Sequence, residues 1–292
     1  MDNTSNLFTS RSYLFVPANR IDRISKALSS DADAIIIDLE DAVSNAEKTI
    51  ARKNLQAFFA QQTTKINKPV WIRINNIGGK QNDDTSDFKQ DLLLCQQLKQ
   101  HLLGIVLPKV ENGETIEYVH NTTKLPIIAQ LETAHAIYML KAIVSKAYIK
   151  GLHAISYGTL DICNELNLSL NSQAQKDFIN HLRYQLLLAS KASGLSPPIE
   201  SIYADFKDEK GLTKMANYVS DLGFSGMLAI HPNQLDSINE AFITSKIDIS
   251  FAKKVINHYT KTKEATFAIN GIMVDLPLIN QCDAVIKKLN KN

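Results

Sequence analysis

The stretch ADAIIIDLEDAV, residues 32–43, joins an apolar run to a group of acidic side chains. Its three consecutive isoleucines (35–37) do not alternate with polar residues, which is typical of a strand covered on both faces in a parallel sheet. Asp38, Glu40 and Asp41 follow at the carboxyl end of that run. Because functional side chains gather at the carboxyl ends of parallel strands, this stretch predicts a buried strand that ends at a site.

Seven further strand candidates alternate with helix-sized segments along the chain, which favours repeated βα units around a parallel sheet. The eight candidates are residues 12–16, 32–38, 69–75, 103–108, 125–132, 152–158, 199–205 and 226–232. Eight strands with seven or eight helices match a TIM (β/α)8 barrel. A doubly wound open sheet has similar elements, and a count of strands does not show whether the sheet closes.

The 292 residues exceed what a barrel requires. Helical patterns continue after the eighth strand, at 249–262 and again from residue 276, with the short apolar stretch ATFAINGIMVD between them. We therefore expect a catalytic (β/α)8 barrel over residues 1–245 and a C-terminal helical extension or lid over residues 246–292.

The composition describes a folded chain with no global electrostatic partner. Hydrophobic residues make up 45% of the chain and the net charge is +2, so neither nucleic acid nor a membrane surface is indicated as a partner. The three cysteines are scattered, which suggests reduced thiols. No signal-peptide pattern opens the sequence, and no segment approaches the roughly 18 apolar residues of a membrane span. We expect a cytoplasmic protein.

Two acids at consecutive strand ends, Glu132 and Asp161, are candidates for a metal site. Mg²⁺ prefers oxygen ligands and keeps several waters, so one or two protein carboxylates and a chelating substrate are sufficient to bind it. The alternative is structural, with Glu132 capping the helix that begins at Thr133 and Asp161 starting the next helix. The spacing alone leaves both interpretations open.

Arg73, at the end of the third strand, could grip a carboxylate or stabilise the charge of an enolate. It could equally form an ion pair with Asp38 or Glu40, and the two interpretations are compatible. Asp38, Glu40 and Asp41 could fix Arg73 or hydrogen-bond waters on a bound metal, or they could cap the following helix.

Two other polar residues at strand ends can be explained by a structural role. Lys109 could meet a phosphate or carboxylate, or be a solvated structural lysine, and His231, just before Pro232, fits a packed, hydrogen-bonded histidine better than a catalytic one. The chain has no zinc-type histidine spacing, P-loop, G-x-S-x-G elbow or well-placed dinucleotide-binding motif.

The order and spacing of eight short motifs resemble one family closely. The motifs are RSYLFVPANR (11–20), ADAIIIDLEDAV (32–43), WIRIN (71–75), LPKVE (107–111), LETA (131–134), YGTLD (157–161), GFSGMLAIHPNQL (223–235) and NGIMVDLP (270–277). Together they resemble the citrate lyase β-subunit-like proteins of the HpcH/HpaI aldolase superfamily, which includes malyl-CoA and citramalyl-CoA lyases.

This resemblance implies a Mg²⁺-dependent barrel that forms a homotrimer or a hexamer. It puts Glu132 and Asp161 at the metal positions and Arg73 at the place of a substrate-binding and catalytic arginine, with Glu132 also close to the substrate. Asp275 matches a tail aspartate that acts as acid and base, in its own or a neighbouring subunit. Met227 and Ile272 replace lysines that the family usually has, so its contacts with the thioester carrier or a neighbouring subunit are not carried over there.

The function that follows is a reversible Claisen-type cleavage beside a CoA thioester. The expected substrate is a 3-hydroxy-3-carboxyacyl-CoA of the citramalyl-CoA, malyl-CoA or citryl-CoA type, and the products are acetyl-CoA and a 2-oxo acid. Two alternatives stay open: a class II pyruvate-type aldolase acting on free acids, and a non-catalytic citrate-lyase-like subunit that kept the fold.

Overall fold

The computed structural model describes residues 10–62, 66–77, 86–145, 150–243 and 249–289. The chain forms two compact units, Met1–Phe242 and Ile243–Asn292. The first unit contains the sheet and its helices, and the second contains two helices and a hairpin.

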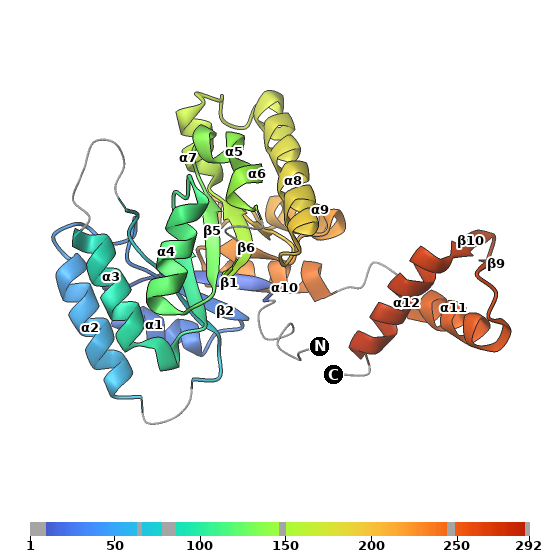
Figure 1. The fold of residues 1–292 in the computed structure, drawn as a ribbon, viewed down its shortest axis with the longest axis horizontal. Coiled ribbons are helices and arrows are strands. Elements are labelled where there is room, and N and C mark those ends of the chain that lie inside the picture. The colour runs from blue at the N-terminus through green and yellow to red at the C-terminus, as the bar shows by residue number, and fades with distance from the viewer. Residues whose placement is uncertain (1–9, 63–65, 78–85, 146–149, 244–248, 290–292) are drawn as a thin grey trace. The chain divides into compact units, whose positions relative to one another are not determined.

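All eight expected strands form, and all of them are parallel in a single sheet (Figure 1). They are β1 (Ser12–Pro17), β2 (Ala34–Asp38), β3 (Val70–Arg73), β4 (Gly104–Leu107), β5 (Ile127–Leu131), β6 (Leu152–Tyr157), β7 (Ile199–Glu200) and β8 (Gly226–Ala229). Their order is β6-β5-β4-β3-β2-β1-β8-β7, so each strand except β6 pairs with the next in sequence, and β8 returns to β1. The sheet is nearly closed into a (β/α)8 barrel. β7 is much shorter than the predicted 199–205.

The uninterrupted apolar strands bury both of their faces. Ile35 and Ile37 lie in the cluster between the strands and the surrounding helices, whereas Ile36 lies in a second cluster inside the barrel. All three are fully buried. Alternate side chains of a strand point to opposite faces, so an apolar run without alternation is what a barrel strand requires.

Trp71 is the largest fully buried side chain of the barrel interior. A Cβ on Gly104, in the next strand, would lie 2.2 Å from its Cζ3 atom and 2.5 Å from the Pro126 carbonyl oxygen. Glycine at this position is therefore what lets the indole fill the interior.

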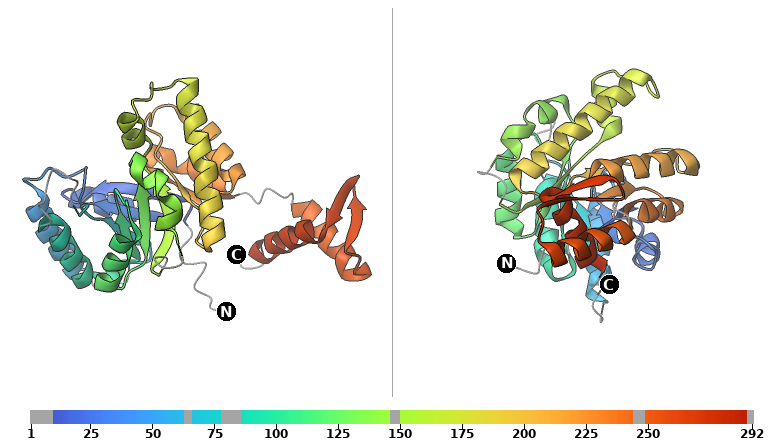
Figure 2. Two further views of the ribbon diagram at one scale, coloured as in Figure 1. Left: turned by 45° about the horizontal axis from the view of Figure 1, so that its top comes forward. Right: turned by 90° about the vertical axis from the view of Figure 1, so that its right-hand side faces the viewer.

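The helices of the first unit lie outside the strands (Figures 1 and 2). They are α1 (Ile21–Leu28), α2 (Lys48–Ala60), α3 (Ser86–Gln97), the 3₁₀ turn η1 (Lys99–His101), α4 (Gly113–Thr123), α5 (Ala134–Tyr138), α6 (Leu140–Ile143), α7 (Thr159–Glu165), α8 (Gln173–Ser193), α9 (Glu209–Leu222), η2 (Pro232–Gln234) and α10 (Leu235–Ile243). Side-chain caps fix several starts. Ser172 accepts from the Gln175 amide to begin α8, and Asp208 accepts from the Gly211 amide to begin α9.

The second unit contains α11 (Ile249–Thr262), β9 (Thr266–Ile269), β10 (Ile272–Asp275) and α12 (Leu276–Leu289) around its own small core. The two strands are antiparallel, and Asn270 (φ 52°) and Gly271 (φ 78°) form the turn between them. Positive φ at both positions is what a type I′ hairpin turn needs, and Asn-Gly supplies it. The stretch expected only as an apolar segment in a helical extension is thus a hairpin.

None of the helices in the described ranges has the length and apolarity needed to cross a membrane. The three cysteines are all buried and none is in a disulfide.

Candidate active site

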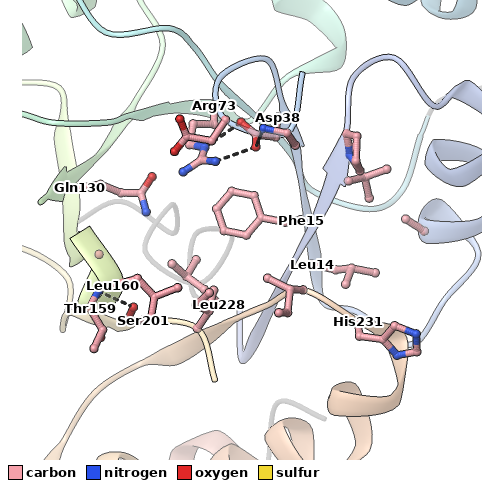
Figure 3. Close-up of a pocket in the computed structure, with 18 of the residues that line it drawn as sticks. Leu14, Phe15, Asp38, Arg73, Gln130, Thr159, Leu160, Ser201, Leu228 and His231 are labelled. Carbon is pink, nitrogen blue, oxygen red and sulfur yellow. Dashed lines mark hydrogen bonds and ion pairs between the residues drawn. The ribbon is translucent and has the colours of Figure 1, made fainter. Parts of the chain in front are cut away.

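A pocket of about 740 Å³ opens where the strands of the barrel end (Figure 3). Side chains from β1, β2, β3 and β5 line it together with the segments that follow β6, β7 and β8. Among its lining residues are Asp38, Asp41, Arg73, Glu132 and Asp161. The structure therefore brings most of the predicted strand-end residues to one cavity.

Glu132 directly follows β5 and is 3% exposed. Its Oε2 accepts a hydrogen bond of 3.1 Å from the Lys109 amide. It does not cap α5, because the Thr133 hydroxyl accepts the Ala136 amide at 3.1 Å and fills that role. The capping alternative for Glu132 is therefore wrong, and its carboxylate faces the pocket.

Asp161 lies in the first turn of α7 and also lines the pocket. A Cβ at Gly158 would lie 3.0 Å from Asp161 Oδ2 and 3.0 Å from Glu132 Oε1. The two carboxylate oxygens therefore border the same small space and are separated by no more than twice that distance. Any side chain at Gly158 would fill the space between the two acids.

The electrostatics of this space fit a hard cation. Burial, together with the negative charges of Glu40 and Asp161, raises the pKa of Glu132 to about 8 against the pull of Arg73. Two oxygens that share one Mg²⁺ ion lie roughly 3 to 4 Å apart, a separation that the Gly158 geometry allows. In the described ranges, no three His, Cys, Asp or Glu side chains converge on one possible metal position. Two acids with open positions for water and substrate suit Mg²⁺ better than a closed structural site.

Arg73 ends β3 and is held by two acids at the end of β2, Asp38 and Glu40. Its Nε and Nη2 donate to Asp38 Oδ1 and Oδ2 at 2.7 and 2.6 Å, and its Nη1 lies 3.3 Å from Glu40 Oε2. The guanidinium also stands 4.8 Å from the ring centroid of Phe15. Burial works to lower the pKa of Arg73, but the hydrogen bonds and charge of Asp38 outweigh it and the pKa is raised. Arg73 is thus a fixed cation at the pocket wall.

The three acids at the end of β2, Asp38, Glu40 and Asp41, make different contacts. Asp38 also accepts the Glu40 and Ala42 amides at 3.0 and 3.2 Å, so it both caps the following turn and holds Arg73. Glu40 Oε1 accepts from Lys109 Nζ at 2.6 Å. Asp41 is 59% exposed and its Oδ1 lies 3.6 Å from the same Lys109 nitrogen.

Two other predicted positions have structural contacts. His231 begins η2, where its Nδ1 accepts the Asn233 amide at 3.2 Å, and its ring stacks on Phe206 with centroids 4.8 Å apart. Asp275 ends β10 in the second unit, and its Oδ1 accepts the Leu278 amide at 3.2 Å, which caps α12.

Arg23, Lys26 and Ser201 are among the pocket residues that the sequence did not reveal. Arg23 and Lys26 line the pocket from α1, and Ser201 lines it just beyond β7. Arg23 and Lys26 read as ordinary surface charges of an amphipathic helix, so only the position of α1 after β1 could have pointed to them. Ser201 lay inside the overextended strand 199–205 and carried no signal.

Comparison with known proteins agrees with this barrel. Residues 11–232 match the HpcH/HpaI aldolase/citrate lyase family, and the chain belongs to that family. The mitochondrial citramalyl-CoA lyase of Rattus norvegicus is 28% identical over 94% of this chain and 85% of its own. A (3S)-malyl-CoA thioesterase of Cereibacter sphaeroides is 34% identical over 91% of this chain and 89% of its own.

Two solved structures from Mycobacterium tuberculosis resemble the chain. The protein CitE from Mycobacterium tuberculosis, in complex with magnesium, acetoacetate and coenzyme A, superimposes with a TM-score of 0.78 at 26% identity, covering 97% of this chain and 98% of that one. The citrate lyase beta subunit of the same organism, with oxaloacetate and magnesium, has a TM-score of 0.67 at 26% identity and covers 82% of this chain.

Proposed function

We propose that the chain is a Mg²⁺-dependent carbon–carbon lyase that reversibly cleaves a 3-hydroxy-3-carboxyacyl-CoA to acetyl-CoA and a 2-oxo acid. The observation that carries the proposal is the pair of oxygens from Glu132 and Asp161 that flank one space beside the fixed cation Arg73. The citramalyl-CoA lyase relative and the CitE complex with magnesium and coenzyme A support the same substrate class.

Each residue has a distinct part in the proposed reaction. Glu132 and Asp161 hold Mg²⁺, which supplies Lewis-acid stabilisation of negative charge on substrate oxygens. Glu132 also contacts the substrate. Arg73 donates hydrogen bonds to the oxygen on which charge develops as the bond breaks, and Asp38 keeps its guanidinium in place. Asp38, Glu40 and Asp41, which contact Arg73 and Lys109, would hydrogen-bond waters on the bound ion.

Asp275 is the proposed acid and base. The acetyl-CoA enolate left by bond cleavage needs a proton at carbon, and the Asp275 carboxyl donates it; in the reverse direction the carboxylate removes that proton. We assign the barrel to residues 1–245, the lid to residues 246–292, and the working state to a homotrimer or hexamer, in which Asp275 serves its own or a neighbouring pocket.

Two basic residues of α1 support a thioester with an anionic carrier. Arg23 and Lys26 line the same pocket as the two acids, and phosphate groups are bound in proteins by such cations. Both side chains are exposed at the pocket wall, so they favour a substrate with further anionic groups, such as a CoA thioester, over the free acids of a class II aldolase.

Product analysis tests the proposal. Purified protein with Mg²⁺ is expected to release acetyl-CoA and a 2-oxo acid in equal amounts from citramalyl-CoA, malyl-CoA or citryl-CoA. Asp161→Ala is expected to abolish the release without unfolding the barrel. Activity that neither EDTA nor Asp161→Ala affects would contradict the metal assignment.

Thioester hydrolysis is a second candidate, which the 34% identity to a (3S)-malyl-CoA thioesterase favours. The same assay separates the two, because hydrolysis yields free CoA and the intact hydroxy acid. Free thiol appearing without a 2-oxo acid would identify the hydrolase.

A further inference from the structure

The barrel has a seam between β6 and β7, where side chains replace the backbone ladder found between other strands. β6 and β7 stand at the two ends of the strand order, so the described residues form no ladder between them. Near the amino ends, the Ser196 amide donates to the His153 carbonyl at 3.1 Å. Near the carboxyl ends, beside the pocket, the contacts come from side chains.

A buried triad joins β6, β7 and α8 at this seam. Tyr157 Oη, on the last residue of β6, donates to Glu200 Oε1 at 2.5 Å. Arg183 of α8 donates to the same carboxylate, from Nη2 to Oε1 at 2.8 Å and from Nε to Oε2 at 3.1 Å. Tyr157 and Glu200 are fully buried and Arg183 is 7% exposed. Both oxygens of Glu200 are therefore engaged: Oε1 ties β7 to β6 and to α8, and Oε2 ties it to α8.

Ser201, the residue just after β7, makes a second tie. Ser201 is 2% exposed, and its Oγ accepts the Thr159 amide at 3.1 Å (Figure 3). Thr159 begins α7, for which Gly158 provides no side-chain cap. Thus two consecutive residues hold the end of β6 and the segment that follows it: Glu200 binds Tyr157 and Ser201 binds Thr159.

The segment held in this way carries one of the two pocket acids. Asp161 lies two residues beyond Thr159, and Gly158 faces both acids. Glu132, in contrast, extends from β5, which pairs with β4 and β6 along its length. The distance between the acids therefore depends on where the segment 157–161 is held, by the seam on one side and on the other by the Gly158 amide, which donates to the Leu131 carbonyl at 3.1 Å.

We propose that Glu200 and Ser201 are positioning residues that set Asp161 against Glu132. The inference rests on the proposed metal site. Octahedral Mg²⁺ tolerates little error in ligand position, and side chains that orient metal ligands typically change metal affinity about 10- to 100-fold when they are removed. The backbone hydrogen bond from Gly158 to Leu131 holds this segment on the β5 side, and the ties to Glu200 and Ser201 hold it on the β7 side.

The test compares Ser201→Ala and Glu200→Gln with a matched control, Asp33→Asn. Asp33 forms a bidentate pair with Arg11 at 2.7 Å from each oxygen, just before β2 and so at the opposite ends of the strands. Its loss destabilises the barrel away from the pocket. Each variant of the full chain is titrated with Mg²⁺ by calorimetry, and its melting temperature is measured. Hydrogen exchange of the Thr159 amide is measured without metal.

We expect Ser201→Ala and Glu200→Gln each to weaken Mg²⁺ binding about tenfold or more. Ser201→Ala is also expected to speed exchange of the Thr159 amide about tenfold in the metal-free protein. Asp33→Asn is expected to lower the melting temperature while Mg²⁺ binding stays within about twofold of the wild type. Should Glu200→Gln fail to fold, Ser201→Ala decides alone.

The positioning role is overturned if Ser201→Ala binds Mg²⁺ as the wild type does, or if Asp33→Asn weakens binding as much as the seam variants do. Asp161→Ala, titrated alongside, separates this failure from failure of the metal site. If Asp161→Ala loses Mg²⁺ and the seam variants do not, only the positioning inference is wrong. If Asp161→Ala binds normally, the metal assignment itself is wrong.

Discussion

Arg73 and Asp38 face each other from the ends of neighbouring strands and share two hydrogen bonds of 2.7 and 2.6 Å. They are direct partners in the register of β3 and β2. The bidentate pair fixes the plane of the guanidinium, because both oxygens of the carboxylate are used. The sequence offered an ion pair with Asp38 as an alternative to substrate binding by Arg73. In the structure that ion pair fixes the orientation of the Arg73 side chain.

Asp38→Asn tests this arrangement. Removing one member of a buried pair leaves an uncompensated charge and costs about 3 to 5 kcal/mol, part of which Glu40 offsets here. We expect a lower free energy of unfolding by urea and a fall in kcat/KM of about a hundredfold, because a small displacement of Arg73 misaligns the substrate. The exposed pair of Arg20 and Asp22 supplies the control, and Asp22→Asn is expected to change neither quantity. Unchanged kcat/KM in Asp38→Asn would contradict the role.

Gly104→Ala tests how the barrel is filled. The new methyl group would meet the Trp71 ring, and overpacking of this kind costs about 1 to 3 kcal/mol. We expect a lower melting temperature. The double variant Gly104→Ala with Trp71→Phe should be more stable than the sum of the two single changes implies. Simple additivity of the three measurements would show that the two residues do not compete for space.

The pair of Arg11 and Asp33 predicts a pH dependence of stability. Burial opposes ionisation of Asp33, but the hydrogen bonds and charge of Arg11 prevail and lower its pKa from 3.8. A lowered pKa in the folded state means that the carboxylate stabilises the fold above pH 3.8 and that this contribution fades as the pH falls through the folded value. The difference in unfolding free energy between the wild type and Asp33→Asn should therefore be constant near neutral pH and shrink below pH 4. A difference that grew in acid would reverse the sign of this prediction.

Mixed oligomers test where Asp275 acts. Asp161→Ala and Asp275→Asn are each expected to be inactive, because one lacks a metal ligand and the other lacks the proposed acid. If Asp275 serves a neighbouring pocket, co-expressing the two variants should restore part of the activity, since some pockets then combine intact residues from two chains. If Asp275 serves its own pocket, the mixture stays inactive. Full activity of Asp275→Asn alone would remove it from the mechanism.

Much of the fold could be predicted because its signals are local. A run such as Ile35 to Ile37 indicates a strand buried on both faces whatever its neighbours are. The predicted β7 was too long because residues 202–205 include apolar and aromatic side chains, yet its pairing with β8 ends at Glu200. The hairpin at 266–275 did carry a signal in the dipeptide Asn270-Gly271, which the apolar letters around it obscured.

The candidate site was less predictable, since it depends on contacts between distant segments. Strand-end logic located Arg73, Glu132 and Asp161 at one pocket. It could not show that Thr133 rather than Glu132 caps α5, nor that Ser201 holds the Thr159 amide, because both depend on side-chain orientation. Asp275 lies in the second unit, where its carboxylate caps α12.

The most direct measurement is a crystal structure of the protein with Mg²⁺ and a 2-oxo acid such as pyruvate. We predict one ion with about six oxygen neighbours at roughly 2.0 to 2.1 Å, of which Glu132 and Asp161 each supply one and the oxo acid supplies two. An ion bound elsewhere, or a ligand held with the two carboxylates turned away from it, would show that Glu132 and Asp161 are not the metal ligands.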